Sequence, residues 1–221
     1  MSYRFFALLL IVAFTGCTYP TFTNPIVEPK QAERFEELFG VYQATHPDSG
    51  EVCWLHIGRC DKNLPEGFHK FVWVSPPAPA GIEQGLTVGQ YIGFIFKSGD
   101  SYVVQLPFME NIQDNQAEVV SEKWGHEKIV GYQLVRLKKL EKLLKLDFLE
   151  DEKVEELVNR KVLAGRIEQK VDETTDPPTV SRKDIIVTAT TKELHKFFSE
   201  HEHDELFKSS GFVFSKADAG Q

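Results

Sequence analysis

Cysteine and histidine side chains are the first candidates for chemistry in this 221-residue sequence. Cys53, His56 and Cys60 are residue types that hold zinc in proteins. Their spacings of three and four residues suit one face of a helix. Residues 52–57, however, alternate as a β-strand does, which turns Cys53 and His56 to opposite faces. The sequence therefore favours a structural histidine in a strand over a zinc site.

Cys53 and Cys60 are also a candidate disulfide pair. A disulfide requires Cα atoms within about 7 Å of each other, whereas an extended chain would hold these two roughly 23 Å apart. A bridge therefore requires the chain to turn back near Gly58. In the alternative, both residues behave as small apolar groups, and the sequence leaves the choice open.

A second group of candidate metal ligands is His195, His201 and His203, which lie in an acidic stretch near the C-terminus. Such a group can bind a metal ion, so a metal-dependent enzyme is one functional alternative. His201 also follows Leu194 by seven residues, which predicts a partly covered imidazole at a helix end. The sequence has no Gly-x-Ser-x-Gly motif and no phosphate-binding loop. It thus predicts no cofactor and favours a non-catalytic role.

Aromatic residues recur on the segments that alternate as strands. The simplest interpretation is that they form the apolar core. A second is that some of them line a concave pocket for an apolar small molecule, with Tyr42, Trp54 and Trp73 as the candidate lining residues. A third is a structural or interaction protein that has no small-molecule ligand and presents an exposed apolar patch to a partner protein.

The elements that must position these residues are mainly strands. Strand patterns cover residues 40–46, 52–57, 68–74, 87–97, 101–108, 129–140, 142–149, 166–171, 184–189 and 212–214. Helix patterns cover 31–39, 151–164 and the segment that Thr190 and Glu193 open with capping-box spacing. This order predicts an α+β fold that is mostly antiparallel β, with a curled or barrel-like sheet and two helices late in the chain.

The first strand pattern opens with Gly40-Val41-Tyr42, directly after a helix pattern. These residues resemble the Gly-x-Trp opening of the lipocalin-like (calycin) barrels, with tyrosine in place of tryptophan. The resemblance implies a single barrel whose interior can hold an apolar ligand.

The N-terminus has the order of a secretory signal: Arg4, the apolar run 5–14, then small residues. The run is about half the ~20 residues that a membrane-spanning helix needs. Phe14-Thr15-Gly16-Cys17 resembles the signal of bacterial lipoproteins. The resemblance implies that Cys17 is acylated, with palmitate as a test label, and anchors a cell-envelope protein. By the same resemblance, Thr18, which is not the aspartate of inner-membrane retention, favours the periplasmic face of the outer membrane if the cell has one.

The lipoprotein resemblance also divides the chain. It implies a signal peptide (1–16) and a lipidated tether (17–30), and the strand and helix patterns predict a single β-rich α+β domain (31–216) before a disordered tail (217–221). Prolines at positions 20, 25 and 29 favour extended backbone in the tether. The expected partners are the membrane, through the lipid, and a hydrophobic small molecule or an envelope protein.

The negative net charge argues against nucleic acid as a partner. The formal net charge is −8, and binding to nucleic-acid phosphates needs clustered lysine and arginine. Basic residues do gather at Arg136, Lys138, Lys139, Lys142 and Lys145, with acidic residues close behind. We interpret this cluster as a solvated sheet face; the alternative is a local patch for anionic lipid headgroups.

Overall fold

One sheet joins the strands of the computed structural model, which describes residues 19–46, 50–60, 64–76, 87–109, 128–172, 179–200 and 203–217. The strands are β1 (Thr21–Phe22), β2 (Gly40–Thr45), β3 (Val52–Arg59), β4 (Phe68–Ser75), β5 (Thr87–Ser98), β6 (Ser101–Met109), β7 (Ile129–Leu140), β8 (Leu143–Leu149), β9 (Gly165–Asp172), β10 (Thr179–Val187) and β11 (Phe207–Lys216). The helices are α3 (Asp151–Asn159) and α4 (Thr191–Glu200), with short 3-10 turns η2 (Pro29–Gln31), η3 (Glu36–Leu38) and η4 (His203–Glu205).

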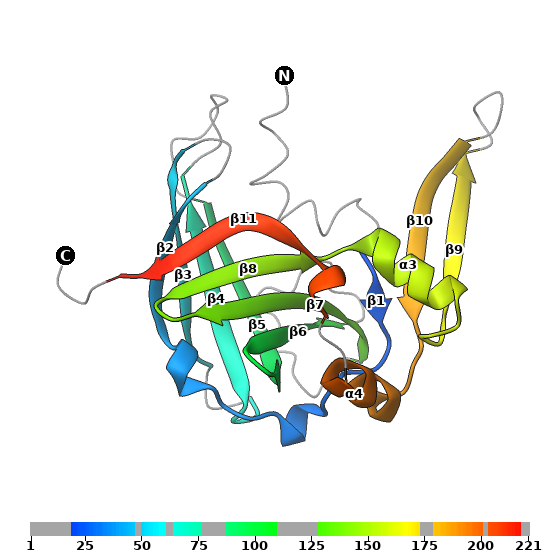
Figure 1. Cartoon of the computed structure of the whole chain (residues 1–221), viewed down its shortest axis with the longest axis horizontal. Coiled ribbons are helices and arrows are strands. Elements are labelled where there is room, and N and C mark those ends of the chain that lie inside the picture. Colours follow the sequence, from blue (N-terminus) through cyan, green and yellow to red (C-terminus); the bar gives the residue numbers. More distant parts are fainter. Residues whose placement is uncertain are drawn as a thin grey trace.

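Eight of the described strands close into an antiparallel barrel (Figure 1). Strands β2 to β7 each pair with the next strand along the chain, and β11 pairs with both β8 and β2 to complete the ring. Two-residue connections join β5 to β6 and β7 to β8, and connections this short require antiparallel pairing. The predicted fold class, a mostly antiparallel, barrel-like sheet with two helices late in the chain, is confirmed.

Side chains alternate along the barrel strands and form two apolar clusters. The lumen cluster consists of buried residues at inward positions and includes Leu55, Phe71, Trp73, Tyr91, Leu137 and Phe214. The outer cluster lies on the outside of the same sheet, is covered by α3, α4 and β1, and includes Phe22, Phe68, Phe94, Leu134, Val158 and Leu194. The barrel wall is thus buried on both faces over part of its circumference.

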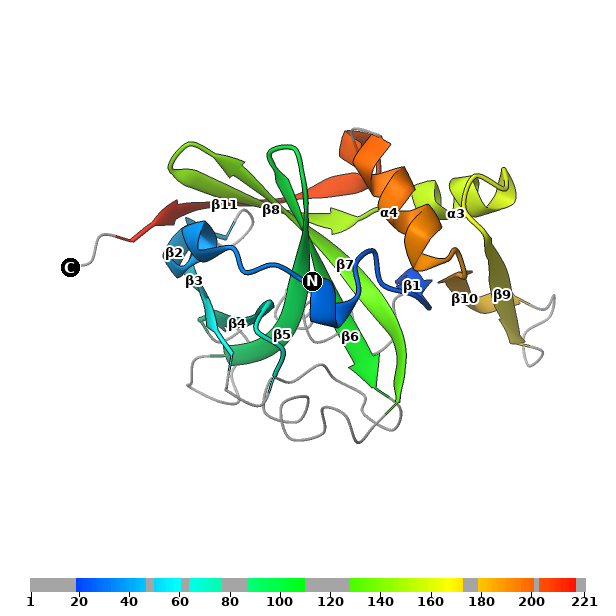
Figure 2. The ribbon, with the colours of Figure 1, turned by 90° about the horizontal axis from the view of Figure 1, so that it is seen from below.

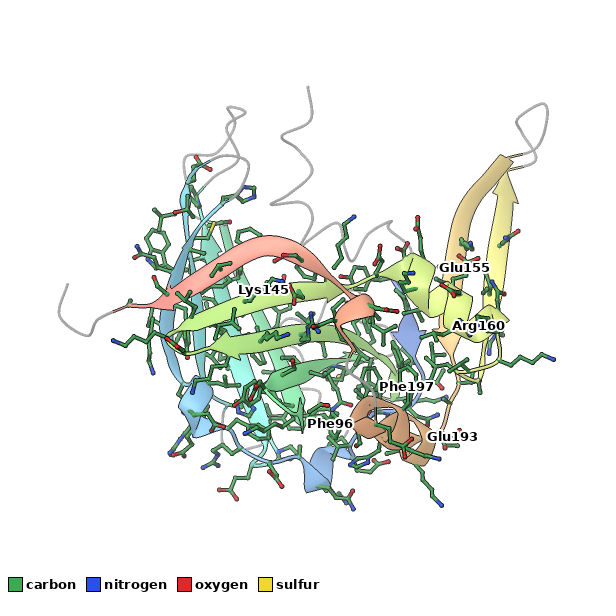
Figure 3. The ribbon with its side chains drawn as sticks, viewed as in Figure 1. Phe96, Lys145, Glu155, Arg160, Glu193 and Phe197 are labelled. Atoms are coloured by element: carbon green, nitrogen blue, oxygen red, sulfur yellow. The ribbon has the colours of Figure 1, made fainter. Side chains whose placement is uncertain are left out.

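A side layer packs on the outer face of the barrel (Figure 2). In this layer β1 pairs antiparallel with β7 and parallel with β10, and β9 extends the sheet beyond β10. Aromatic side chains, among them Phe96 of β5 and Phe197 of α4, fill the space between the barrel and α4 (Figure 3). An ion pair between Glu155 and Lys183 joins α3 to β10.

The start of the described chain belongs to this side layer. Phe22 is 1% exposed and Ile26 is fully buried, both in the outer cluster. The prediction of an extended tether over 17–30 is therefore wrong for residues 19–30, because their apolar side chains complete a core; residues 17 and 18 lie outside the described residues. At the other end, Ala217 donates its N–H to the Val41 carbonyl at 2.9 Å, and the rest of the predicted tail lies outside the described residues.

The N-terminus of α4 carries the predicted capping box. The Thr190 N–H donates to Glu193 Oε2 at 2.8 Å, and the Glu193 N–H donates to Thr190 Oγ1 at 3.3 Å. Two amides that the helix leaves without intrahelical partners are thereby satisfied. The hydrogen bond from the Thr190 backbone also lowers the pKa of the Glu193 carboxyl.

The predicted helix over residues 31–39 is wrong. Glu33 forms a β-bridge with Ile95 there, and the helical residues are only Gln31, at the end of the 3-10 turn η2, and the 3-10 turn η3. The apolar spacing that suggested a helix has another cause: Phe35 and Leu38 both point into the lumen cluster, where the segment crosses one end of the barrel.

Candidate functional site

A cavity of about 80 Å³ lies inside the barrel. Its walls come from strands β3 to β8, through apolar and aromatic side chains, and Tyr19 completes them. The lining includes Leu55, Trp73, Tyr91, Val104, Val135 and Leu146. The cavity is several times larger than the roughly 10–15 Å³ that one water molecule requires. The side chains of the barrel therefore leave part of its interior unfilled.

The chemistry of the cavity wall is almost entirely apolar. Gln133, which is 6% exposed, supplies the one amide side chain among the described lining residues, and none of those residues carries a charge. Burying a charged group against such a wall would leave it without compensation for its lost hydration. The wall therefore suits an apolar molecule that places at most a hydrogen-bonding group beside Gln133.

One end of the barrel is sealed around His69, which is fully buried. Its Nε2 accepts a hydrogen bond from the Phe35 N–H at 3.2 Å, and its Nδ1 donates to the Gly67 carbonyl at 3.0 Å. This arrangement requires a neutral imidazole, and burial lowers the pKa of His69 to about 4. A Cβ on Gly67 would lie 2.1 Å from the Ala32 carbonyl oxygen, so only glycine fits this closure.

The three predicted pocket residues occupy three different positions. Trp73 is buried and lies in the cavity wall. Tyr42 belongs to the lumen cluster, but its hydroxyl donates to the Leu38 carbonyl at 2.9 Å and it is not among the lining residues. The prediction for Trp54 is wrong. Its neighbours Cys53 and Leu55 point inward, so Trp54 lies on the outer side of β3, where it is half-buried.

The predicted ligands of the first zinc site do not converge. Cys53 is buried in the lumen cluster, His56 is exposed on the other face of β3, and Cys60 packs against the outer cluster. No bond joins Cys53 to Cys60, because β3 runs extended between them without the required turn near Gly58. Burial also raises the pKa of the Cys53 thiol to about 11, which keeps it protonated and unreactive.

The second predicted metal group is described only in part. His195 lies on the exposed face of α4, where its ring contacts Phe96 edge-on with 5.1 Å between ring centroids. His201 lies outside the described residues, and only the backbone of His203, in η4, is described. Within the described part of the chain, no three His, Cys, Asp or Glu side chains gather in a way that could hold a metal ion.

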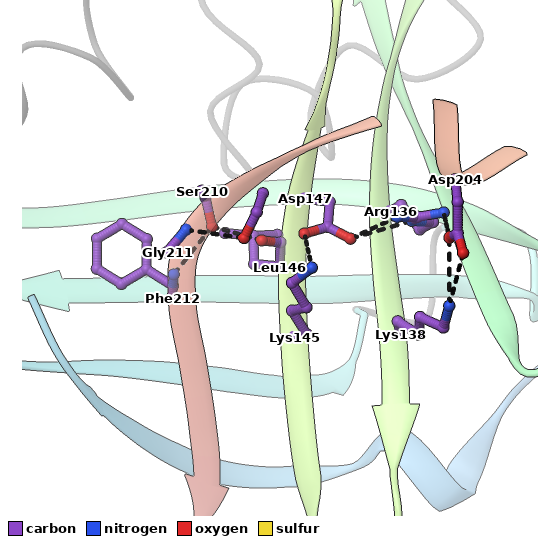
Figure 4. A network of polar contacts seen from close by, with 10 residues as sticks. Arg136, Lys138, Lys145, Leu146, Asp147, Asp204, Ser210, Gly211 and Phe212 are labelled. Carbon is purple, nitrogen blue, oxygen red and sulfur yellow. Dashed lines mark hydrogen bonds and ion pairs between the residues drawn. The ribbon is translucent and has the colours of Figure 1, made fainter. Parts of the chain in front are cut away.

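A buried ion pair between β7 and β8 escaped the sequence analysis (Figure 4). Arg136 donates from Nε and Nη2 to Asp147 Oδ2 at 3.1 and 2.7 Å, and both side chains are buried. Arg136 Nη1 also donates to Asp204 Oδ1 at 2.6 Å. Hydrogen bonds from Lys138 and Arg136 lower the pKa of the Asp204 carboxyl, and Lys145 Nζ lies 3.2 Å from Asp147 Oδ1. The network fastens η4 to the barrel wall.

This network corrects the interpretation of the basic cluster as a solvated face, at least for Arg136. The Arg136 guanidinium lies over the Phe207 ring, 4.9 Å from its centroid, and is covered by the chain that leads into β11. A signal was present in the sequence: a two-residue turn at 141–142 sets Leu140 opposite Leu143, and counting back places Arg136 opposite Asp147. A buried arginine with a carboxylate directly across the ladder indicates a structural pair.

No helix in the described residues is both long and apolar enough to span a membrane. Comparison of this chain with protein families, with curated proteins and with solved structures found no match.

Proposed function

We propose that this protein is a non-catalytic carrier that holds an apolar small molecule in the cavity of its barrel. One observation carries the proposal: the interior of the barrel contains an apolar cavity that its own side chains leave unfilled. Pockets for small molecules are concave and mostly apolar, with few polar groups to set orientation. Gln133 is the group of this kind in the described lining.

The same proposal includes attachment to a membrane through a lipid on Cys17, in the cell envelope and with the periplasmic face of the outer membrane as the favoured location. The arrangement of the cavity supports this part. Tyr19 lines the cavity, and two residues of chain reach at most about 7 Å. A lipid on Cys17 would thus hold the cavity close to the membrane surface, where apolar molecules are available.

A carrier role fits the positions of the reactive side chains better than an enzyme does. Of the described cysteines and histidines, those on β3, β4 and α4 lie apart from one another, and His69, on β4, is used in the closure of the barrel end. The Cys53 thiol is held in its protonated form. These observations support binding without chemistry at the cavity.

The proposal is tested by titration with cis-parinaric acid, a fluorescent apolar probe. The protein is a chain that begins at residue 18, which contains every described residue. Val135→Trp fills the cavity from β7, while Val130→Trp places the same side chain at an exposed position of the same strand. We expect saturable, one-to-one binding by the parent chain and Val130→Trp, and at least tenfold weaker binding by Val135→Trp. Equal affinities for both variants would place the probe elsewhere and refute the carrier function.

A further inference from the structure

Strand β9 is the terminal strand of the sheet in the described part of the chain. The barrel itself has no open edge because β6 pairs with β7, and the strand order beyond β7 runs β1, β10, β9. Figures 1 and 2 both show β9 outermost, with β10 on one side and no described element on the other. An edge of this kind presents backbone N–H and C=O groups that a further strand can pair with.

Strand β9 is held in place by its pairing with β10 and by the packing of one of its faces. It pairs with β10 over its whole length, from Gly165 opposite Val187 to Asp172 opposite Thr179. The irregularity in this hairpin lies on β10, so β9 keeps a regular alternation. One face of β9 is anchored by Ile167, which packs against the outer cluster. A partner strand would therefore meet a preformed template and not a flexible segment.

Charges alternate in sign along β9. Arg166, Glu168, Lys170 and Asp172 occupy every second position, and alternate residues of a strand share one face. In the structure, Arg166 and Glu168 do share a face: Arg166 Nε lies 2.6 Å from Glu168 Oε1, and both side chains are largely exposed. A strand with this pattern complements a second copy of itself when the two run antiparallel.

We propose that two copies of this protein dimerise by antiparallel pairing of their β9 strands, centred on Gln169. In this register Arg166 lies opposite Asp172 of the second copy, and Glu168 lies opposite Lys170. The pattern is symmetric, so each contact occurs twice across a two-fold axis. The eight residues of β9 in each copy need no rearrangement, because the edge is already formed.

The alternation of charge also rejects the neighbouring registers. Moving the centre to residue 168 would set Arg166 opposite Lys170, and moving it to residue 170 would set Glu168 opposite Asp172. Parallel pairing in register would oppose like charges at every charged position. Like charges directly across a strand pair are destabilising, so the sequence of β9 selects one mode of self-pairing. Because the charge pattern of β9 complements β9 of another copy, we infer that the strand added at this edge comes from a second copy of the protein.

The register is tested by cysteine cross-linking of the full chain in mild detergent, with micelles in excess over protein. Residues directly opposite in an antiparallel pair have Cα atoms about 4.5–5.5 Å apart, which suits a disulfide. Gln169→Cys should therefore form a disulfide-linked dimer on mild oxidation. Arg166→Cys is the matched control, since the two copies of residue 166 would lie roughly 20 Å apart. Equal cross-linking at both positions, or none at residue 169, overturns the proposal.

Charge reversal tests the same pairing without a covalent bond. Sedimentation of the full chain in the same detergent should show a reversible dimer. Glu168→Lys sets cations opposite each other at two symmetric places and should weaken the dimer about tenfold. Adding Lys170→Glu restores opposite charges and should restore dimerisation, which also shows that the variants fold. A parent chain that stays monomeric, or a double variant as weak as the single one, overturns the proposal.

Discussion

Protonation of His69 should destabilise the fold at mildly acidic pH. The imidazole is neutral in the folded protein, where it accepts from the Phe35 N–H and donates to the Gly67 carbonyl. Its pKa is lowered to about 4 by burial, against about 6.5 in an unfolded chain. The unfolded state therefore binds a proton first as the pH falls. The stabilisation is complete above pH 6.5, decreases between pH 6.5 and 4, and does not change further below that range.

The size of this effect follows from the two pKa values. The full shift corresponds to about 3 kcal/mol at 1.36 kcal/mol for each pH unit, and about 2 kcal/mol of it is lost by pH 5. Urea unfolding at pH 7.5 and at pH 5 measures the loss, in a range where most carboxyl groups stay ionised. His69→Gln is the control, because glutamine can accept and donate hydrogen bonds without titrating.

For each protein, the free energy of unfolding at pH 5 is subtracted from that at pH 7.5. The destabilisation caused by the substitution itself then cancels. The parent chain should lose about 2 kcal/mol more than His69→Gln on going from pH 7.5 to pH 5. Every other titratable residue is the same in the two proteins, so the difference between them reports His69 alone. If the two proteins lose the same stability, His69 is not a buried neutral imidazole and the description of the sealed barrel end is wrong.

Three further predictions test other parts of the structure. Gly67→Ala should destabilise the protein by about 3 kcal/mol in urea unfolding, because its Cβ would overlap the Ala32 carbonyl oxygen; a change below 0.5 kcal/mol, taken as roughly the level of a neutral surface substitution, would contradict this contact. Arg136→Met should cost about 3–5 kcal/mol by leaving the Asp147 carboxylate buried without its partner, and adding Asp147→Leu should recover most of this loss. Cys17→Ser should abolish incorporation of labelled palmitate in cells, and a label that persists would remove the lipid anchor from the account.

The sequence predicted those parts of the fold that depend on neighbouring residues, such as strands in which apolar and polar side chains alternate. Buried and exposed side chains alternate clearly in strands such as β2 and β3, and the Thr190–Glu193 capping box marks the start of α4 within one residue. The β-bridge of Glu33 to Ile95 was not predictable in this way, because residues far apart in sequence determine it. The same holds for β1, two residues long, which is a strand only because β7 and β10 lie on either side of it.

The candidate site was predictable only in part. The aromatic content of the strands indicated an apolar interior, but the placement of each side chain depends on register. One residue of offset separates Trp54, on the outer side of β3, from Leu55, in the cavity wall. Gln133 carried no signal of its own, since a glutamine in a strand is usually solvated. The free volume of the cavity follows from how eight strands curve around their side chains, which no local pattern encodes.

The central claim is that the barrel cavity holds an apolar small molecule, and the molecule carried by the isolated protein tests it most directly. Full-length chains with Val135→Trp and with Val130→Trp are isolated from cell envelopes beside the parent chain and extracted with organic solvent. Mass spectrometry should then find one class of apolar compound, near one molecule per chain, in the parent and in Val130→Trp, and a strong depletion in Val135→Trp. The same compounds in equal amounts from all three chains would contradict the claim.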